Sequence, residues 1–249
     1  MRNLDVLKVF SALLLVLSIF SCAEESKMLD NAEFGYQYFP VDIGDYRLFR
    51  VDSTIVDNNG GTILQSRFFI KEEITESFKS AFGETIFRVE RSRSETRDGN
   101  YTITDVWTAQ RDEVIAIRTE ENLRFNKLKF PIVLNNKWEG NAFENLTDVF
   151  IAGDRVEVYK DWGDYEVIAK GINMTVFGID YSDVVTVKQA DHDFLLEKRS
   201  SYEHYAPNVG LIRKEMVILD TQCQTCENQA WIDKEDKGFI LSQILIEHN

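Results

Sequence analysis

The sequence predicts an all-β protein with little helix, built on one large antiparallel sheet that curves into a half-barrel, a barrel or a sandwich-like body. Apolar and polar residues alternate from Phe39 onward, the period of a strand that buries one face. Turn signals such as Asn58-Asn59-Gly60-Gly61 interrupt this alternation, because Asn and Gly tolerate the positive φ of hairpin turns. Capped helical patterns are scarce, and many strands joined by short turns are typical of curved or closed sheets.

The first half of the chain carries two hairpin signals. Asn58 to Gly61 separates two alternating segments, and Asp98-Gly99 separates two more. A short β-branched run follows them. The predicted strands of this half are 49–55, 64–70, a segment that opens at 87–89, 101–107 and 114–119.

The second half continues the alternation, with two long strands near its C-terminal end. Asn208 and Gly210 flank Val209 and predict a tight connection between two of these strands. The predicted strands are 156–159, 165–169, 184–187, 194–205, 211–219 and 239–246.

Two stretches of the chain echo each other. One begins Phe39-Pro40 and the other Phe130-Pro131, and in both an aliphatic residue, a free position, a second aliphatic residue and a turn follow. Such a proline starts a strand or lies at an edge, since it cannot donate to a strand ladder. Residues 37–249 are therefore predicted to form the β domain, and 39–129 and 130–249 are either two similar halves or a coincidence.

The N-terminus is predicted to be an export signal. A basic start, with Arg2 and Lys8, precedes an apolar run that is shorter than the roughly 20 residues of a membrane-spanning helix. The run ends in Ile19-Phe20-Ser21-Cys22, which resembles the lipobox of bacterial lipoproteins, although Phe20 is bulkier than usual there. The resemblance implies that residues 1–21 are removed and that Cys22 is lipidated. The alternative is an ordinary signal peptide with an incidental cysteine.

Residues 22–36 are polar and acidic, and we expect the lipidated Cys22 to be followed by a tether. Glu24 and Glu25 resemble the surface-export signal of Bacteroidetes-type lipoproteins, with a solvated linker as the alternative. The expected location is the outer membrane, on its periplasmic side or at the cell surface.

Three motifs resemble uncharacterised exported lipoproteins of the Bacteroidetes type. They are FPxxxG from Phe39, FPxxxxxxW from Phe130 and YAPNVGLIRKE from Tyr205. The chain departs from that group at Arg47, where Trp is common, and at Asn208, where Gly is common. The resemblance implies an all-β exported domain and no reaction. Asp52-Ser53-Thr54 also resembles the O-glycosylation site of such proteins, which makes Ser53 a candidate.

No catalytic constellation stands out in the sequence, so the chain is expected not to be an enzyme. Its three histidines, His192, His204 and His248, accompany no G-x-S-x-G elbow, and no metal ligand set or cofactor motif is recognised. Carboxylates are too numerous for a glycosidase pair to be chosen. A net charge of −14 without a basic block excludes nucleic acid as an expected partner.

The sequence leaves three functions open. The first is a membrane-anchored cell-envelope lipoprotein with a non-enzymatic binding or structural domain. The second is a carrier of a lipid or hydrophobic ligand in a half-barrel pocket. The third is a carbohydrate-active hydrolase with paired carboxylates. The expected partners are the membrane, through the N-terminal lipid, and an envelope protein, a glycan or a hydrophobic ligand.

The three cysteines divide into one and two. If Cys22 takes lipid, Cys223 and Cys226 remain as an even pair in an oxidising compartment. We expect them to form a disulfide that staples a hairpin turn. A redox pair, half of a metal site and free thiols are the alternatives.

Overall fold

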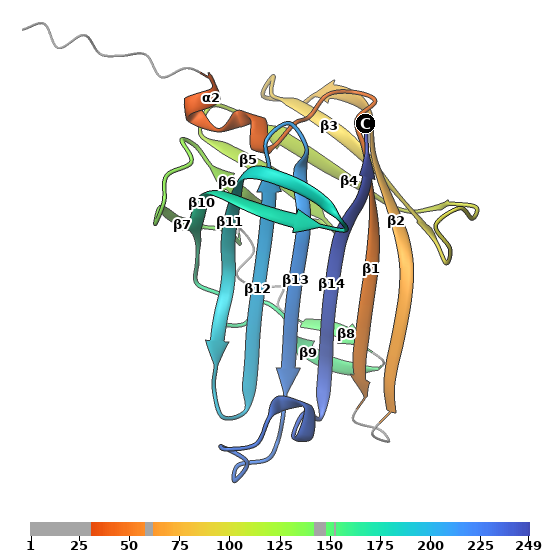
Figure 1. The fold of residues 1–249 in the computed structure, drawn as a ribbon, viewed down its shortest axis with the longest axis vertical. Coiled ribbons are helices and arrows are strands. Elements are labelled where there is room, and N and C mark those ends of the chain that lie inside the picture. Colours follow the sequence, from red (N-terminus) through yellow and green to blue (C-terminus); the bar gives the residue numbers. More distant parts are fainter. Residues whose placement is uncertain (1–30, 58–61, 142–147, 152) are drawn as a thin grey trace, which may run out of the picture. The chain divides into compact units, whose positions relative to one another are not determined.

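Twelve strands form one antiparallel sheet in the computed structural model, which describes residues 31–57, 62–141, 148–151 and 153–249 (Figure 1). Their order is β6-β5-β4-β3-β2-β1-β14-β13-β12-β11-β10-β7, and β8 and β9 form a separate two-stranded sheet. The predicted all-β fold with a strongly curved antiparallel sheet is confirmed.

The strands are long in the centre of the sheet and short at its edges. Their bounds are β1 (Tyr46–Asp57), β2 (Thr62–Lys79), β3 (Thr85–Ser94), β4 (Thr102–Arg111), β5 (Ile115–Glu120), β6 (Leu123–Lys129), β7 (Lys137–Glu139), β8 (Asp148–Ile151), β9 (Asp154–Glu157), β10 (Asp164–Val176), β11 (Ile179–Asp193), β12 (Glu197–Ala206), β13 (Gly210–Asp220) and β14 (Lys237–His248).

Three of the predicted turns fall at strand connections. Asp98-Gly99 lies between the antiparallel strands β3 and β4. The Asn58 to Gly61 turn lies outside the described residues, but the flanking strands pair from Asp57 opposite Thr62 onward, as in a hairpin. Asn208 and Gly210 take φ values of 61° and 86° between β12 and β13. Positive φ is accessible to Gly at little cost and to Asn more readily than to most other residues, which explains this connection.

The sheet is one meander that returns on itself. Strands β1 to β6, from residues 39–129, lie in sequence order, as do β7 and β10 to β14 from residues 130–249. The two predicted halves thus contribute six neighbouring strands each, and they pair along β1 and β14, where Val51 lies opposite Gln243.

The two edge strands, β6 and β7, meet at a seam that nearly closes the sheet. The backbone N–H of Asn126 donates to the carbonyl oxygen of Gly140 at 2.8 Å. The indole Nε1 of Trp138 donates to the carbonyl oxygen of Asn126 at 2.7 Å. Phe125 and Asn141 form an isolated antiparallel bridge beside these bonds. Gly140 has no room for a side chain, because a Cβ there would lie 2.3 Å from the Tyr165 ring.

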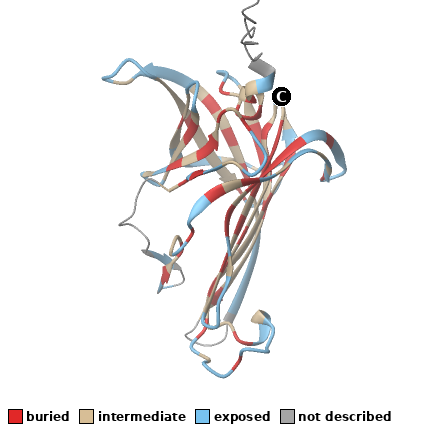
Figure 2. Cartoon of the chain, turned by 90° about the vertical axis from the view of Figure 1, so that its left-hand side faces the viewer, coloured by how far each residue is buried: buried red, intermediate tan, exposed pale blue. Residues whose placement is uncertain are grey.

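Buried apolar residues form two clusters. Figure 2 shows that buried residues alternate with more exposed ones along the strands. The larger cluster draws on most strands of the sheet and includes Leu128, Ile132, Tyr165, Val187 and Ile218. In the second cluster, the end of the β10–β11 hairpin packs against β1, β2, β13 and β14.

The folded body begins at Asn31, inside the segment that was expected to be a tether. A short helix, α2 (Asn31–Phe34), and a 3₁₀ turn, η2 (Tyr36–Tyr38), lead into the sheet. The Tyr36 ring meets Phe130 edge-on with centroids 4.8 Å apart, and the Tyr38 hydroxyl donates to the carbonyl oxygen of Asp183 at 2.8 Å. Among the described residues, no helix has the length and apolar character needed to cross a bilayer.

Candidate functional site: a charged pocket inside the sheet

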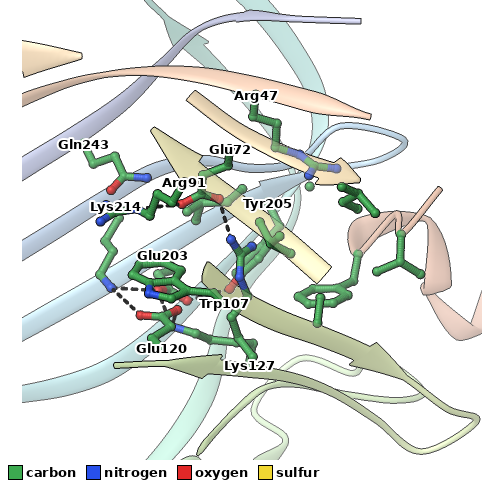
Figure 3. Close-up of a pocket in the computed structure, with 18 of the residues that line it drawn as sticks. Arg47, Glu72, Arg91, Trp107, Glu120, Lys127, Glu203, Tyr205, Lys214 and Gln243 are labelled. Carbon is green, nitrogen blue, oxygen red and sulfur yellow. Dashed lines mark hydrogen bonds and ion pairs between the residues drawn. The ribbon is translucent and has the colours of Figure 1, made fainter. Parts of the chain in front are cut away.

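A pocket of about 120 Å³ lies within the curve of the sheet (Figure 3). Residues from nine strands line it, β1 to β6 and β12 to β14, together with residues 39–41 of the N-terminal segment. We call it the interior pocket. Its walls come from both predicted halves of the chain, so it exists only when the meander is complete.

The lining of the interior pocket is unusually rich in charge. Apolar side chains, among them Ile74, Val89, Ala109, Met216 and Leu241, form part of its wall. Five cations and three carboxylates share the remainder, and they are Arg47, Arg91, Arg118, Lys127 and Lys214 with Glu72, Glu120 and Glu203. The pocket therefore concentrates positive charge in a chain whose net charge is −14.

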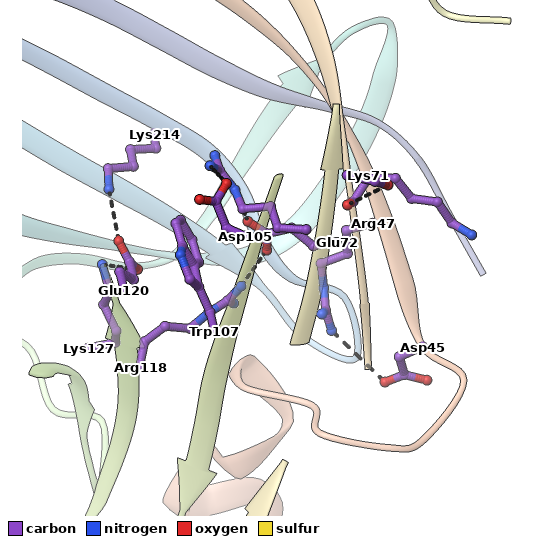
Figure 4. Close-up of polar contacts among 12 residues, drawn as sticks. Asp45, Arg47, Lys71, Glu72, Asp105, Trp107, Arg118, Glu120, Lys127 and Lys214 are labelled. Atoms are coloured by element: carbon purple, nitrogen blue, oxygen red, sulfur yellow. Dashed lines mark hydrogen bonds and ion pairs between the residues drawn. The ribbon is translucent and has the colours of Figure 1, made fainter. Parts of the chain in front are cut away.

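Three arginines and one carboxylate form what we call the arginine cluster: Arg47, Arg91, Arg118 and Glu72. Glu72 accepts from Arg118 at 2.5 Å and from Arg91 at 3.3 Å, and its side chain is 4% exposed. The Trp107 ring lies within cation–π distance of both, 4.2 Å from the Arg91 guanidinium carbon and 5.5 Å from that of Arg118. This arrangement follows from the sheet, because β4, which carries Trp107, lies between β3 and β5. Figure 4 shows Trp107 with Arg118 and Glu72 among these polar contacts.

Arg47 lies on the other side of this cluster, held mainly by backbone oxygens. Its Nε donates to the carbonyl oxygen of Val209, and its Nη2 lies 3.4 Å from the carbonyl oxygen of Pro40. Asp45 is at 4.0 Å, the limit of an ion pair. Burial lowers the pKa of the Arg47 guanidinium, and the like charge of Arg118 lowers it further. Glu72 and Asp45 act in the opposite direction without reversing this shift, so two like charges line the same pocket.

A second group, the lysine cluster, contains Lys127, Lys214, Glu120, Glu203 and Tyr205. Lys127 Nζ lies 3.0 Å from Glu120 and 2.9 Å from Glu203, and Lys214 Nζ lies 3.4 Å from Glu203 and 3.9 Å from Glu120. The Tyr205 hydroxyl donates to the second oxygen of Glu203 at 2.5 Å. The two ammonium groups balance the two carboxylates.

The three carboxylates of the pocket stay ionised. Burial alone raises the pKa of Glu72, but the guanidinium groups of Arg118 and Arg91 outweigh burial and hold that pKa below its usual range. Burial likewise raises the pKa of Glu120 and of Glu203, and in both the ammonium groups of Lys127 and Lys214 reverse the direction. None of the three is therefore held protonated as a general acid requires at neutral pH.

One polar atom of the arginine cluster has no partner among the described residues. It is the Nε of Arg118, which is buried, while the Nη2 of the same side chain binds Glu72. A buried donor without an acceptor costs about 1–3 kcal/mol, and such atoms often mark places where a ligand or water binds.

The residues predicted from the sequence lie apart from this pocket. Cys22 is outside the described residues. Ser53 is half-buried in the middle of β1, paired with Ser66 on β2 and Leu241 on β14, and its glycosylation stays a prediction. Cys223 and Cys226 lie at disulfide distance with Cα atoms 5.5 Å apart, in the connection between β13 and β14.

That connection differs from the expected hairpin turn. It spans residues 221–236 and contains a 3₁₀ turn, η3 (Trp231–Asp233). In the part of the chain that the structure describes, no three His, Cys, Asp or Glu side chains gather as metal ligands would.

The sequence contained one partial sign of the pocket. In the strand around Trp107, Asp105 shares the face of the apolar residues, and Asp105 does lie 3.8 Å from Arg91. Arg47 was noted only as a departure from the resembled lipoproteins. The other charged residues read as solvent-facing positions of their strands.

No protein-family model matches the chain, and no curated protein matches it significantly. Solved structures with a remote similarity include the following two. One is a protein of Bacteroides fragilis, inferred to be exported and described as having a YmcC-like fold, with a TM-score of 0.37, 10% identity, and coverage of 87% of this chain and 99% of that chain. The other is an inferred lipoprotein of Parabacteroides distasonis, with a TM-score of 0.38, 12% identity, and coverage of 85% of this chain and 98% of that chain. Both are too remote for their properties to be transferred to this chain.

Proposed function

We propose that this chain is a membrane-anchored lipoprotein of the outer membrane whose β domain is a non-enzymatic module that binds a small polar ligand in the interior pocket. The anchor rests on Ile19-Phe20-Ser21-Cys22 and on the short apolar run before it. The binding role rests on one observation, the open and charged interior of the sheet.

Filling the interior of a sheet with charged side chains costs desolvation free energy that apolar side chains would not cost. Replacing buried ion pairs by apolar side chains of similar volume is often neutral or stabilising by about 1–4 kcal/mol. Ion pairs can hold strands together, but a purely structural role does not require that eight charged groups surround an open space. A binding domain gains recognition from them, because fixed charges in a pocket select a complementary ligand.

The pocket chemistry favours this proposal over the two alternatives. A volume of about 120 Å³ is below the range of roughly 300–1,000 Å³ that is usual for ligand pockets, and its charged wall is a poor surface for an acyl chain. A carbohydrate hydrolase needs one carboxylic acid with a raised pKa. Glu120 and Glu203, the two pocket carboxylates that share Lys127 and Lys214, both have lowered pKa values.

Anchoring is tested by metabolic labelling with an alkyne fatty acid, followed by membrane fractionation. The wild-type chain should carry the label and sediment with outer membranes, whereas Cys22→Ser should carry none. A wild-type chain without label would contradict the anchor. Protease treatment of intact cells then tells the surface from the periplasmic side.

Ligand binding is tested by calorimetry on the full mature chain with small organic probes, because the natural ligand is not identified. A measurable affinity that is lost in Trp107→Ala supports the binding role. Probes that bind equally to wild type and to this variant would place binding outside the interior pocket.

A further inference from the structure

The surplus positive charge of the interior pocket lies at one end. In the lysine cluster, two ammonium groups face two carboxylates. In the arginine cluster, Glu72 forms ion pairs with Arg91 and Arg118, and Glu120 also attracts Arg118 at longer range, so three guanidinium groups face fewer carboxylates than they would need for balance. Asp45 and Asp105 stand outside the lining, about a third and a quarter exposed, at 4.0 Å from Arg47 and 3.8 Å from Arg91.

We propose that the arginine cluster is the receptor for the anionic group of a small organic ligand, a carboxylate or a phosphate. Arg47 and Arg118 supply the donors, and the Trp107 ring with the apolar wall receives the rest of the ligand. This proposal rests on the binding role proposed above and names the class of ligand.

Three features of the cluster carry the inference. Arg118 keeps a buried Nε–H that has no acceptor in the described part of the chain. Arg47, in the same cluster, is held by the carbonyl oxygens of Val209 and Pro40, with Asp45 only at the 4.0 Å limit of an ion pair. Guanidinium donors match the geometry of carboxylate and phosphate oxygens. An anion between the two would satisfy the free donor and relieve the repulsion between the like charges.

The size of the pocket limits the ligand. An apolar cavity of about 150 Å³ in another protein holds one benzene molecule. The interior pocket, at about 120 Å³, is smaller than that, so it accepts the anionic group and only part of an attached ring. A larger molecule would extend from it.

The test compares matched single-ring probes by calorimetry on the full mature chain at low salt. Benzoate and phenyl phosphate carry the anion, benzamide is neutral, and benzylamine is cationic. We expect at least one anionic probe to bind about tenfold more tightly than benzamide, the size of effect that one charge-assisted hydrogen bond gives. Arg47→Gln should remove this preference. Arg50→Gln, on the same strand but outside the lining, makes the same change in net charge and should preserve it.

Each other outcome has a separate meaning. If benzamide or benzylamine binds as tightly as the anions, and Trp107→Ala abolishes that binding, the pocket binds ligands but the anion receptor is refuted. If no probe binds at millimolar concentration, the anion receptor proposed here and the ligand-binding function proposed above are both refuted. The wild-type comparison needs no variant, so it decides the question even if Arg47→Gln fails to fold.

Discussion

Lys127 Nζ and Glu203 Oε1 lie 2.9 Å apart and join strand β6 to strand β12 through the interior of the sheet. Their side chains are only 5% and 1% exposed. The two strands are not neighbours, since β6 is an edge strand and β12 lies in the other half of the meander. The ion pair therefore ties the two halves together at a point where no strand pairing does so.

Removing the ammonium group should destabilise the fold strongly. Lys127→Met leaves Glu120 and Glu203 buried with only Lys214 between them, and breaking a buried pair in this way costs about 3–5 kcal/mol. Urea unfolding followed by fluorescence measures the change. Arg67→Met is the control. The Arg67 side chain is 61% exposed, and its ion pair with Asp52 should contribute less than about 1 kcal/mol to the free energy of unfolding. Equal losses in the two variants would contradict the structural role of Lys127.

The pocket carboxylates should make the protein sensitive to acid. Glu72, Glu120 and Glu203 have lowered pKa values in the fold, whereas an unfolded glutamate titrates near about 4.3. Their stabilisation is thus complete above about pH 5 and is lost as the pH falls, because the unfolded chain then binds protons that the folded chain does not. The free energy of unfolding, measured by urea at several pH values between 7 and 3, should fall with increasing slope below pH 5.

Glu72→Gln isolates one of these groups. The variant should be less stable at pH 7, and its slope below pH 5 should be shallower by up to about 1.4 kcal/mol per pH unit. His204, whose pKa burial lowers, also removes stability as the pH falls from about 6.5, but this loss cancels between wild type and variant. Glu95→Gln, at a side chain 72% exposed, should leave the slope unchanged. A Glu72→Gln slope equal to that of wild type would refute the assignment.

The fold class was predictable because its signals are local. Alternation along 49–55 and 64–70 reads directly as two strands of a hairpin, and the observed register pairs Ile55 with Leu64. The closure of the sheet was not predictable. Val51 pairs with Gln243, and Asn126 meets Gly140 at the seam, but neither pairing has a turn or a pattern that announces it.

The candidate site was hidden for a related reason. A charged residue on an alternating strand normally faces water, so Glu72, Arg118 and Lys127 read as surface positions. The partners are also far apart in the sequence: Glu72 precedes Arg118 by 46 residues, and Glu203 follows Lys127 by 76 residues. Only the curvature of the complete sheet turns these positions inward and brings them together.

The cysteine pair should stabilise the protein modestly. A disulfide that closes a loop of about four residues raises the free energy of unfolding by roughly 2 kcal/mol on the chain-entropy model. Cys226 is nearly buried, and Cys223 is more exposed. Without reductant, neither thiol should react with iodoacetamide, and intact mass measures this directly. The Cys223→Ser, Cys226→Ser double variant should melt a few degrees lower and still reach the membrane. Labelling of both cysteines in the unreduced native protein would show that the disulfide is absent.

The seam between the edge strands should be intolerant of a methyl group. In Gly140→Ala the added Cβ would lie 2.3 Å from the ring of Tyr165. That ring cannot move aside easily, because it is fully buried and its hydroxyl donates to Asn141 at 2.8 Å. Overpacking of this kind costs about 1–3 kcal/mol, which urea unfolding measures.

Gly99→Ala is the matched control for the seam. Its Cβ would lie 2.5 Å from the Thr96 hydroxyl, 2.6 Å from that of the buried Ser94 and 3.3 Å from the Thr96 carbonyl oxygen, so its two closest contacts are the ends of short polar side chains and not a ring. These hydroxyls can rotate away, so we expect a smaller loss than at Gly140. Hydrogen exchange should also quicken at the Asn126 amide in Gly140→Ala, since that amide donates to the Gly140 carbonyl oxygen. Unchanged exchange together with equal losses at the two glycines would mean that the seam does not hold the sheet closed.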